Sequence, residues 1–190
     1  MKILIVYALG VECGVINLPG HDILLCETGV GKVSAALKTY SSLLQFEPEM
    51  VLSIGSAGAI HHPIGSIVVC SKYVDRDLEK ITELGVPCFL DFQDELAAFN
   101  VSEPYHGCIS SGDTFQTTVK QGGIKADVFD MEAYGSAQIC KERGLPLLAI
   151  KYVTDVIGQN SISHWEENVK HAKKGLQDFL ETLNLSKKSE

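Results

Sequence analysis

The sequence predicts a three-layer α/β/α fold, built as a single domain around a central mixed sheet. Short apolar runs rich in β-branched residues alternate with amphipathic stretches, which is the pattern of strands and helices in α/β proteins. A length of 190 residues is typical of one domain, and 45% hydrophobic with 21% charged residues fits a folded soluble protein. Polar side chains gather where the predicted strands end. Because sites in α/β proteins usually lie at that edge of the sheet, we expect an enzyme or a binding domain.

The first predicted strand is Lys2–Tyr7, whose β-branched core is too short for a secretory signal and lacks a cleavage site. Glu12 follows in the loop beyond this strand, where it is either a functional carboxylate or a solvated loop residue. A second strand at Ile23–Glu27 leads through two glycines into an apolar-periodic helix that includes 33–44. The turn contains GxGK without the spacing of a P-loop, so we interpret its glycines as the formers of a tight turn.

The third strand, Met50–Ile54, is expected to end in the small residues of the Gly55–Gly58 segment. Such residues would let backbone N–H groups face a phosphate, a ribose hydroxyl or a water molecule. A strand is predicted to begin at Ile67, and another at Gly107–Ser110, with a short helix at Asp94–Phe99 between them. Phe115 follows in a polar turn, and the pattern leaves open whether it stacks on a flat ligand or belongs to the core.

The stretch from Asp127 to Asp155 combines a helix start and a strand end, both of which carry carboxylates. Asp130 and Glu132 precede a helix that ends before Gly144. The apolar run Leu147–Val153, interrupted only by Lys151, then predicts a buried parallel strand, with Asp155 at its exit. Two interpretations of the acidic pair remain open, because acidic residues at a helix start also serve as caps.

A long amphipathic helix is predicted from His164 to Leu183, followed by a frayed tail at 186–190. Its apolar residues recur at helical spacing and are expected to form one buried stripe: Trp165, Val169, Ala172, Leu176, Phe179, Leu180 and Leu183.

Composition argues against several classes of partner. The formal net charge of −8 and the pI of about 5.2 disfavour nucleic acid, because binding to it depends on Lys and Arg side chains that neutralise phosphates. No apolar run approaches the roughly 20 residues of a membrane span. The six cysteines show no metal-site spacing, and the adjacent His61 and His62 have no evident third ligand. We therefore expect a cytoplasmic protein with reduced thiols, no bound metal and no cofactor.

Six motifs, found in the family's order and covering nearly the whole chain, resemble the nucleoside phosphorylase and nucleosidase superfamily. Within it, the chain is most similar to the 5′-methylthioadenosine/S-adenosylhomocysteine nucleosidases. The motifs are ALGVE at 8–12, TGVGKVSAAL at 28–37, IGSAGAIHHPIGSIVV at 54–69, SSGDTFQ at 110–116, FDMEAYG at 129–135 and YVTD at 152–155.

The resemblance implies a catalytic role for three carboxylates. Hydrolysis of a purine N-glycosidic bond produces a cationic sugar and an anionic base, and both need stabilisation. Asp155 matches the family's general acid and would protonate purine N7. Glu12 matches the residue that activates the attacking water, and Glu132 would accept a hydrogen bond from the ribose 2′-hydroxyl.

The resemblance also implies a substrate site and an oligomeric state. Phe115 would stack on the base, the Gln116 backbone would bind the purine edge, and Met131 would pack on the ribose. The family's substrate-binding positions further include Ser56, Ala57, Gly58, Phe129 and Thr154. Relatives of this kind are homodimers in which the partner closes the 5′ pocket, so we expect a homodimer that binds a small purine nucleoside.

The sequence departs from the family pattern in three places, which leave the substrate open. The segment between Tyr73 and Gly107, which in the family helps to form the 5′ pocket and the dimer contact, is shortened. Asp130 stands where Glu is common, and Gln116 stands at a position that is usually apolar. The leading hypothesis is release of adenine from 5′-methylthioadenosine or S-adenosylhomocysteine.

Three alternatives remain. The first is a hydrolase of futalosine-type nucleosides in menaquinone synthesis, which would use the same carboxylates. The second is a phosphate-dependent phosphorylase. The sequence argues against it, because only two arginines, Arg76 and Arg143, could bind phosphate. The third is an inert purine-binding protein, which would have no need of Glu12, Glu132 and Asp155 together.

Overall fold

A computed structural model describes residues 1–118, 123–159 and 161–188. The main sheet contains β1 (Lys2–Tyr7), β2 (Asp22–Glu27), β3 (Met50–Ala59), β4 (Ile67–Asp75), β5 (Phe89–Asp91), β7 (Gly107–Ser111), β8 (Val128–Asp130) and β9 (Leu147–Val156). The helices are α1 (Lys32–Phe46), α2 (Gln93–Leu96), α3 (Ala133–Glu142) and α4 (Ser161–Thr182), with a 3₁₀ segment, η1 (Leu78–Leu84). A separate pair of short strands is formed by β6 (Phe99–Val101) and β10 (Leu185–Lys187).

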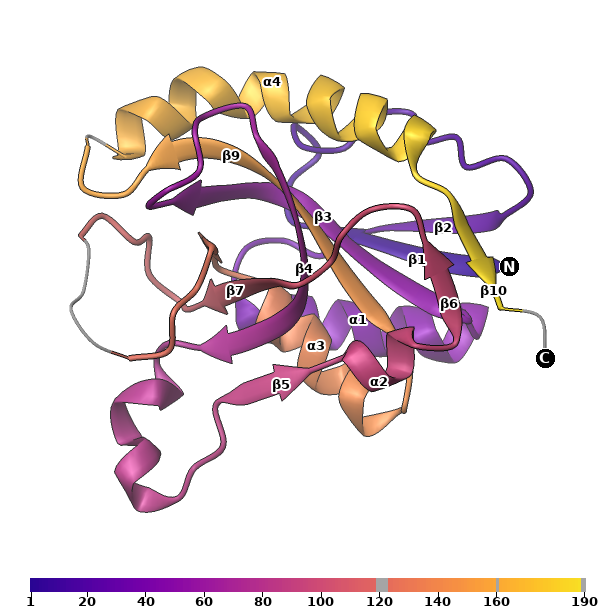
Figure 1. The fold of residues 1–190 in the computed structure, drawn as a ribbon, viewed down its shortest axis with the longest axis horizontal. Helices are drawn as coiled ribbons and strands as arrows, with labels where there is room; N and C mark the ends of the chain where they lie inside the picture. The colour runs from indigo at the N-terminus through magenta and orange to yellow at the C-terminus, as the bar shows by residue number, and fades with distance from the viewer. Residues whose placement is uncertain (119–122, 160, 189–190) are drawn as a thin grey trace.

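The elements form three layers around the mixed sheet. Helices α1 and α3 lie on one face of the sheet, and α4 crosses the opposite face above β9 and β3 (Figure 1). The predicted fold class is therefore confirmed. Fully buried aliphatic side chains from β1, β3 and β9 fill the centre, among them Ile3, Leu52 and Ile150. Burial of such side chains is the main contribution to the stability of a domain of this size.

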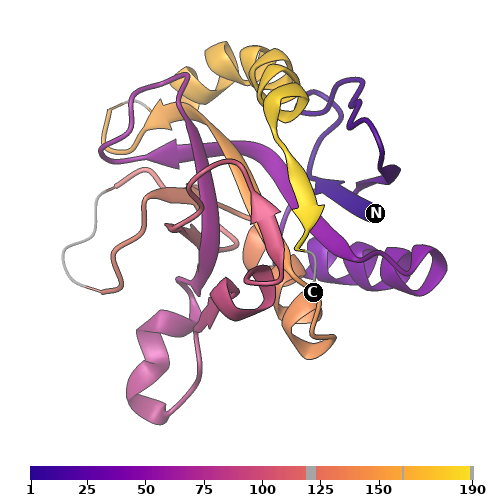
Figure 2. The ribbon, with the colours of Figure 1, turned by 45° about the vertical axis from the view of Figure 1, so that its right-hand side comes forward.

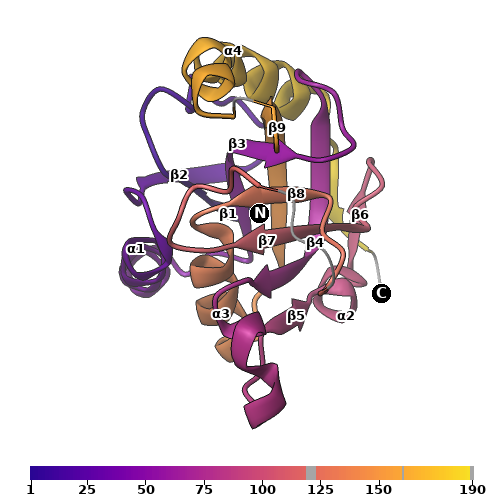
Figure 3. The same cartoon turned by 90° about the vertical axis from the view of Figure 1, so that its left-hand side faces the viewer.

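Part of the sheet closes on itself. The pairings run from β3 to β9, β4, β7 and β8 and return to β3. Strand β9 is parallel to β3, as the sequence predicts, but it is antiparallel to β4. The reason is that β4 returns from a turn after β3 and runs in the opposite direction, with β9 inserted between them. Seen from the end in Figure 3, β3, β7, β8 and β9 surround one central region.

The prediction that β3 ends before the Gly55–Gly58 segment is wrong. The strand continues to Ala59, and Gly58 pairs with Asp155 of β9. A Cβ atom on Gly58 would lie 2.7 Å from Asp155 Oδ2, closer than real Cβ contacts allow. Small residues are needed here because the Asp155 carboxyl lies directly against the neighbouring strand.

The middle of the chain differs from its prediction in one element. The expected helix at Asp94–Phe99 ends at Leu96, and Phe99 instead begins β6. This strand pairs with β10, and the two lie side by side in Figure 2. Ser186 and Lys187, which the sequence assigns to a frayed tail, belong to β10, whereas residues 189–190 lie outside the described part of the chain. Pairing between segments so far apart in sequence has no local signature.

Helices α1 and α3 pack closely on each other, and this packing brings their first residues together. A Cβ atom on Gly135 would lie 2.1 Å from the backbone oxygen of Lys32, so only glycine allows this approach. Gly29 and Gly31 adopt positive φ angles of 77° and 95°, which confirms the tight turn before α1. Helix α1 therefore begins directly beside Glu132.

Among the described residues, no helix has the length and apolar character needed to cross a bilayer. All six cysteines are free.

Candidate active site

A cavity of about 340 Å³ lies where β3 and β9 end, with residues 56–58 and Asp155 in its wall. Its volume falls in the range of pockets for small molecules. All predicted site residues except Thr154 line it: Glu12, Ser56, Ala57, Gly58, Phe115, Gln116, Phe129, Met131, Glu132 and Asp155. Residues that contribute to its wall without having been predicted as site residues are Ala8, Leu9, Val30, Arg76, Asp130, Ile162, Trp165 and Glu166.

Asp155 is buried, with 1% of its surface exposed, and it has an incomplete set of partners. Its Oδ1 lies 3.0 Å from Thr154 Oγ1, and Thr154 Oγ1 also lies 3.3 Å from the carbonyl oxygen of Ala57. The other oxygen, Oδ2, has no hydrogen-bond partner among the described residues. Burial raises the pKa of Asp155, and the Thr154 hydroxyl, the charge of His164 and the nearby Ser161 hydroxyl oppose this only in part. A buried carboxyl with a raised pKa and one free oxygen is suited to donate a proton to a ligand.

Thr154 itself does not reach the cavity. The residue is fully buried, and its backbone oxygen accepts a 3.2 Å hydrogen bond from Asn168 of α4. Its hydroxyl therefore supports Asp155 from behind, and a contact with substrate is not available to it.

Glu12 lies on the opposite side of the cavity and has many donors around it. The backbone N–H and the hydroxyl of Ser56 both donate to Oε1, the former at 2.8 Å. The Leu9 N–H donates to Oε2 at 3.2 Å. Since three donors converge on it, the carboxyl is held as an acceptor. The Ser56 N–H, which we expected to face a ligand, is instead used to hold Glu12.

Glu132 precedes α3 and accepts a 2.9 Å hydrogen bond from the N–H of Gly31, across the contact between α1 and α3. Burial and the nearby charge of Asp130 raise the pKa of Glu132 to about 7, although Lys151 opposes this. Glu132 can therefore change its charge near neutral pH. Its side chain makes no capping hydrogen bond to α3, although Glu132 is the residue at the helix start.

Asp130 does act as a cap. Its Oδ2 accepts a 3.0 Å hydrogen bond from the Ala133 N–H at the start of α3, and Oδ1 accepts one of 2.5 Å from the Ser111 hydroxyl. The cap interpretation, left open for both acidic residues, thus holds for Asp130.

Lys151 of β9 is the cation beneath these carboxylates. Its Nζ lies 3.0 Å from Asp130 Oδ2, with 3% of the lysine side chain exposed. Burial alone would lower the pKa of Lys151, but the charges of Asp130, Glu132 and Glu12 raise it above its ordinary value. No role was predicted for Lys151. The available signal was a single cation within an otherwise apolar strand, which predicts a buried partner because an unpaired charge there is costly.

Two aromatic rings form one wall of the cavity. Phe115 and Trp165 meet edge to face, with ring centroids 6.4 Å apart. Phe115 is 38% exposed, so it is not a core residue. The Gln116 side chain donates to the backbone oxygen of Thr118 at 2.5 Å and so turns toward its own loop. Trp165, assigned by its spacing to the buried stripe of the last helix, in fact lines the cavity.

Arg76 is the one cationic side chain among the described residues that line the cavity. Its guanidinium donates 2.7 Å hydrogen bonds to the carbonyl oxygens of Ser110 and Asp130, and further ones to Gly112 and Thr114. These bonds tie the end of β7, the start of the Phe115 loop and β8 together. The two terminal nitrogens of the guanidinium are thereby bonded to the backbone, whereas Nε has no hydrogen-bond partner among the described residues.

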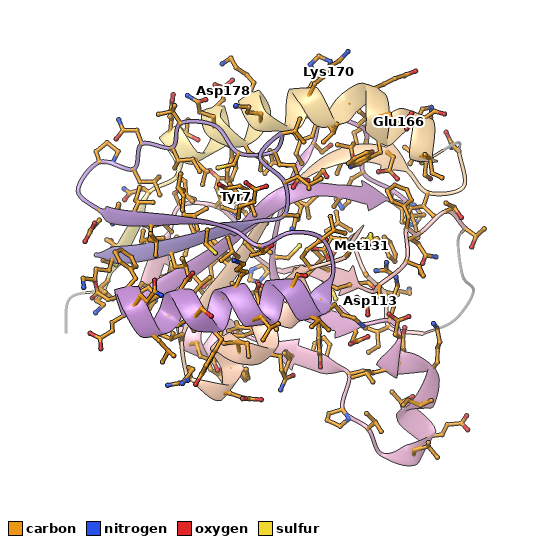
Figure 4. All side chains as sticks on the ribbon, turned by 180° about the vertical axis from the view of Figure 1, so that it is seen from behind. Tyr7, Asp113, Met131, Glu166, Lys170 and Asp178 are labelled. Carbon is orange, nitrogen blue, oxygen red and sulfur yellow. The ribbon has the colours of Figure 1, made fainter. Side chains whose placement is uncertain are left out.

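Val30, just before α1, and Ile162, near the start of α4, are exposed residues of the cavity wall. Figure 4 shows Met131, Asp113 and Glu166 at one end of the molecule. No group of three metal-ligating side chains occurs among the described residues, and His62 instead lies 3.7 Å from a carboxylate oxygen of Asp127. The cavity thus offers carboxyl groups, two aromatic rings and a hydroxyl, which suits acid–base chemistry on a flat, uncharged ligand.

Comparison with known proteins agrees with this geometry. Residues 12–184 match the model of the phosphorylase superfamily. A 5′-methylthioadenosine/S-adenosylhomocysteine nucleosidase of Bacillus thuringiensis is 28% identical over 170 residues, covering 76% of this chain and 73% of the relative. A Bacillus cereus protein of the same name gives the same identity over 169 residues.

Solved structures show the same fold. The nucleosidase of this type from Colwellia psychrerythraea, crystallised with adenine, has a TM-score of 0.80 and 25% identity, covering 95% of this chain and 93% of that one. The futalosine hydrolase of Helicobacter pylori has a TM-score of 0.79 and 20% identity, covering 94% and 95%. The match of the family model over most of the sequence establishes the relationship: the chain belongs to the phosphorylase superfamily.

Proposed function

We propose that this enzyme, a nucleosidase, hydrolyses the N-glycosidic bond of 5′-methylthioadenosine or S-adenosylhomocysteine and releases adenine. The observation that carries the proposal is the unpartnered, buried oxygen of Asp155 in the same cavity as Glu12 and Glu132. A general acid for a leaving base requires this combination of a retained proton and a free oxygen. The names of the relatives support the choice of substrate.

In the proposed reaction the base lies against Phe115, with N7 at Asp155 Oδ2. As the C1′–N9 bond breaks, its electron pair moves to the purine, and Asp155 transfers its proton to N7. A water molecule held at Glu12 forms the new C1′–O bond and gives its proton to Glu12. Glu132 accepts from the 2′-hydroxyl, and its negative charge stabilises the cationic sugar.

The charges around the cavity argue for hydrolysis over phosphorolysis. A phosphorylase must bind phosphate, usually through arginine. Here the Arg76 guanidinium already bonds to backbone oxygens, and Lys151 is paired with Asp130. We therefore expect base release at the same rate with and without phosphate. A rate that depends on phosphate and yields ribose 1-phosphate would contradict hydrolysis.

The relatives favour an adenine nucleoside over a futalosine-type one. The 28%-identical relatives are 5′-methylthioadenosine/S-adenosylhomocysteine nucleosidases, whereas the futalosine hydrolase is 20% identical. Liquid chromatography of reactions with 5′-methylthioadenosine, S-adenosylhomocysteine and futalosine tests the choice: adenine from the first two supports it, and hypoxanthine from futalosine alone contradicts it.

We also propose that the enzyme is a homodimer. Helix α1 exposes an apolar stripe of Val33, Leu37 and Leu44, with 70%, 64% and 56% of their surfaces accessible. The stripe is continuous with Val30, which lines the cavity, so a second copy seated on α1 would extend the cavity wall. Light scattering should give the mass of a dimer, and Leu37→Glu should give that of a monomer. A wild-type monomer with full activity would contradict the proposal.

A further inference from the structure

The indole of Trp165 donates a hydrogen bond to the hydroxyl of Ser56, at 3.1 Å between Nε1 and Oγ. That hydroxyl in turn donates to Glu12 Oε1. Trp165 lies near the start of α4, Ser56 lies in β3, and Glu12 follows β1. Three elements that are distant in the sequence are thus joined by one chain of hydrogen bonds that ends on the proposed base.

The direction of this chain is fixed by chemistry. An indole N–H can only donate, so the Ser56 oxygen must accept from it. The Ser56 proton is then directed toward Glu12, and Glu12 Oε1 receives both this proton and the Ser56 N–H. A protonated Oε1 could not accept both. The arrangement therefore keeps Oε1 as an acceptor and leaves the remaining lone pair of Oε2, which has the Leu9 N–H as its donor, for a water molecule.

We propose that Trp165 is a positioning residue, which acts through Ser56 to hold the Glu12 carboxylate in the orientation that activates water. The inference rests on the proposed function for the role of Glu12. The indole thus has a second role besides its contact with Phe115 in the cavity wall. Because Trp165 also belongs to α4, the docking of that helix on the sheet and the orientation of Glu12 become linked.

The kinetic test uses Trp165→Phe, which removes the N–H and keeps an aromatic ring in the wall. We expect kcat to fall about fivefold, the scale of one neutral hydrogen bond, with KM unchanged within twofold. Ser56→Ala should lower kcat more, by at least about tenfold, because it removes a bond to a charged group. In the Ser56→Ala background, adding Trp165→Phe should change kcat by less than twofold, since the path to Glu12 is already broken.

Independent effects would overturn the proposal. If Trp165→Phe lowers kcat by the same factor in both backgrounds, or if it raises KM alone, the indole is only a wall of the substrate site. Ser53→Ala is the matched control, because Ser53 is another buried hydroxyl in β3 for which the structure gives no bond to Glu12. It should leave kcat within twofold of the wild type.

A second measurement needs no substrate. Trp165 is the one tryptophan of the sequence, so its indole N–H gives a single, assigned signal in an NMR correlation spectrum. Ser56→Ala should shift this signal and speed its exchange with water, and Ser53→Ala should not. A signal unmoved by Ser56→Ala would overturn the proposal even if the kinetics agreed. Absence of base release from every nucleoside in the wild type would instead contradict the proposed function, and the indole signal would still decide the hydrogen bond.

Discussion

The two sides of the cavity surround their carboxyl groups with different numbers of hydrogen-bond donors. On one side, Asp155 is buried without an ion-pair partner among the described lysines and arginines, and its Oδ2 is unpartnered. On the other side, Glu12 receives three donors, and Lys151 lies beneath Asp130. The first environment raises the pKa of Asp155, and the second surrounds the Glu12 carboxyl with hydrogen-bond donors. Two carboxyl groups in such different environments are suited to the separate roles of acid and base.

The two sides also differ in how the chain positions their carboxyl groups. Asp155 is positioned by its strand, where Gly58 of β3 leaves room for it. Glu12 lies in a loop and is positioned by hydrogen bonds from Leu9 and Ser56. A strand position is fixed by the sheet itself, whereas a loop position needs its own donors. The base side should therefore be more sensitive to the loss of single hydrogen bonds.

The largest effect is expected at the acid side. Asp155→Asn keeps the shape of the side chain and removes the transferable proton, so kcat should fall by about 10²- to 10⁴-fold. Adenine affinity, measured by calorimetry, should change little. Asp178→Asn, an exposed substitution in α4, is the control. Base release close to that of the wild type by Asp155→Asn would mean that the two sides do not differ in function.

Lys151, the buried cation paired with Asp130, should contribute strongly to the stability of the fold. Lys151→Met leaves Asp130 buried without its partner, which should lower the free energy of unfolding by about 3 kcal/mol. Urea denaturation monitored by circular dichroism measures this. Lys38→Met removes an exposed lysine of α1 and should change stability by less than about 0.5 kcal/mol. Equal effects of the two substitutions would show that Lys151 does not stabilise the carboxylates above it.

Glu12→Gln tests the base side directly. The amide retains the size of the side chain and cannot take a proton from water, so kcat should fall by about 10²-fold with KM little changed. Glu142→Gln, at an exposed position near the end of α3, controls for the loss of a negative charge. If KM rises and kcat is retained, Glu12 binds substrate and does not activate water.

Most of the framework follows from the sequence because it depends on local patterns. The apolar runs of β1, β3 and β9 and the periodicity of α1, α3 and α4 are sufficient to predict those elements. The errors occur where distant segments decide the outcome. Phe99 joins β6 because β10, at the other end of the chain, pairs with it. The Gly55–Gly58 segment looks like a turn, but its backbone pairs with β9.

The site shows the same division. The resemblance to a known family supplied the positions of the carboxylates, and the cavity brings them together. Trp165 was misassigned because helical spacing records only that it is apolar, whereas its N–H partner lies 109 positions away in the sequence. Lys151 had a visible signal in its apolar strand, but the identity of its partner required the structure.

The smallest effect we predict is a change of rate with pH, and it tests the role of Glu132. The pKa of Glu132 is raised to about 7 by burial and by Asp130, so Glu132 is largely neutral at pH 6 and largely charged at pH 8. The neutral form cannot stabilise the cationic sugar. The value of kcat/KM should therefore rise with pH up to about 7, by at most tenfold per pH unit below that value. Rates measured from pH 5 to 9 test this acid limb, and Glu132→Gln should remove it. An acid limb that persists in Glu132→Gln would assign it to another group and would leave Glu132 without the proposed electrostatic role.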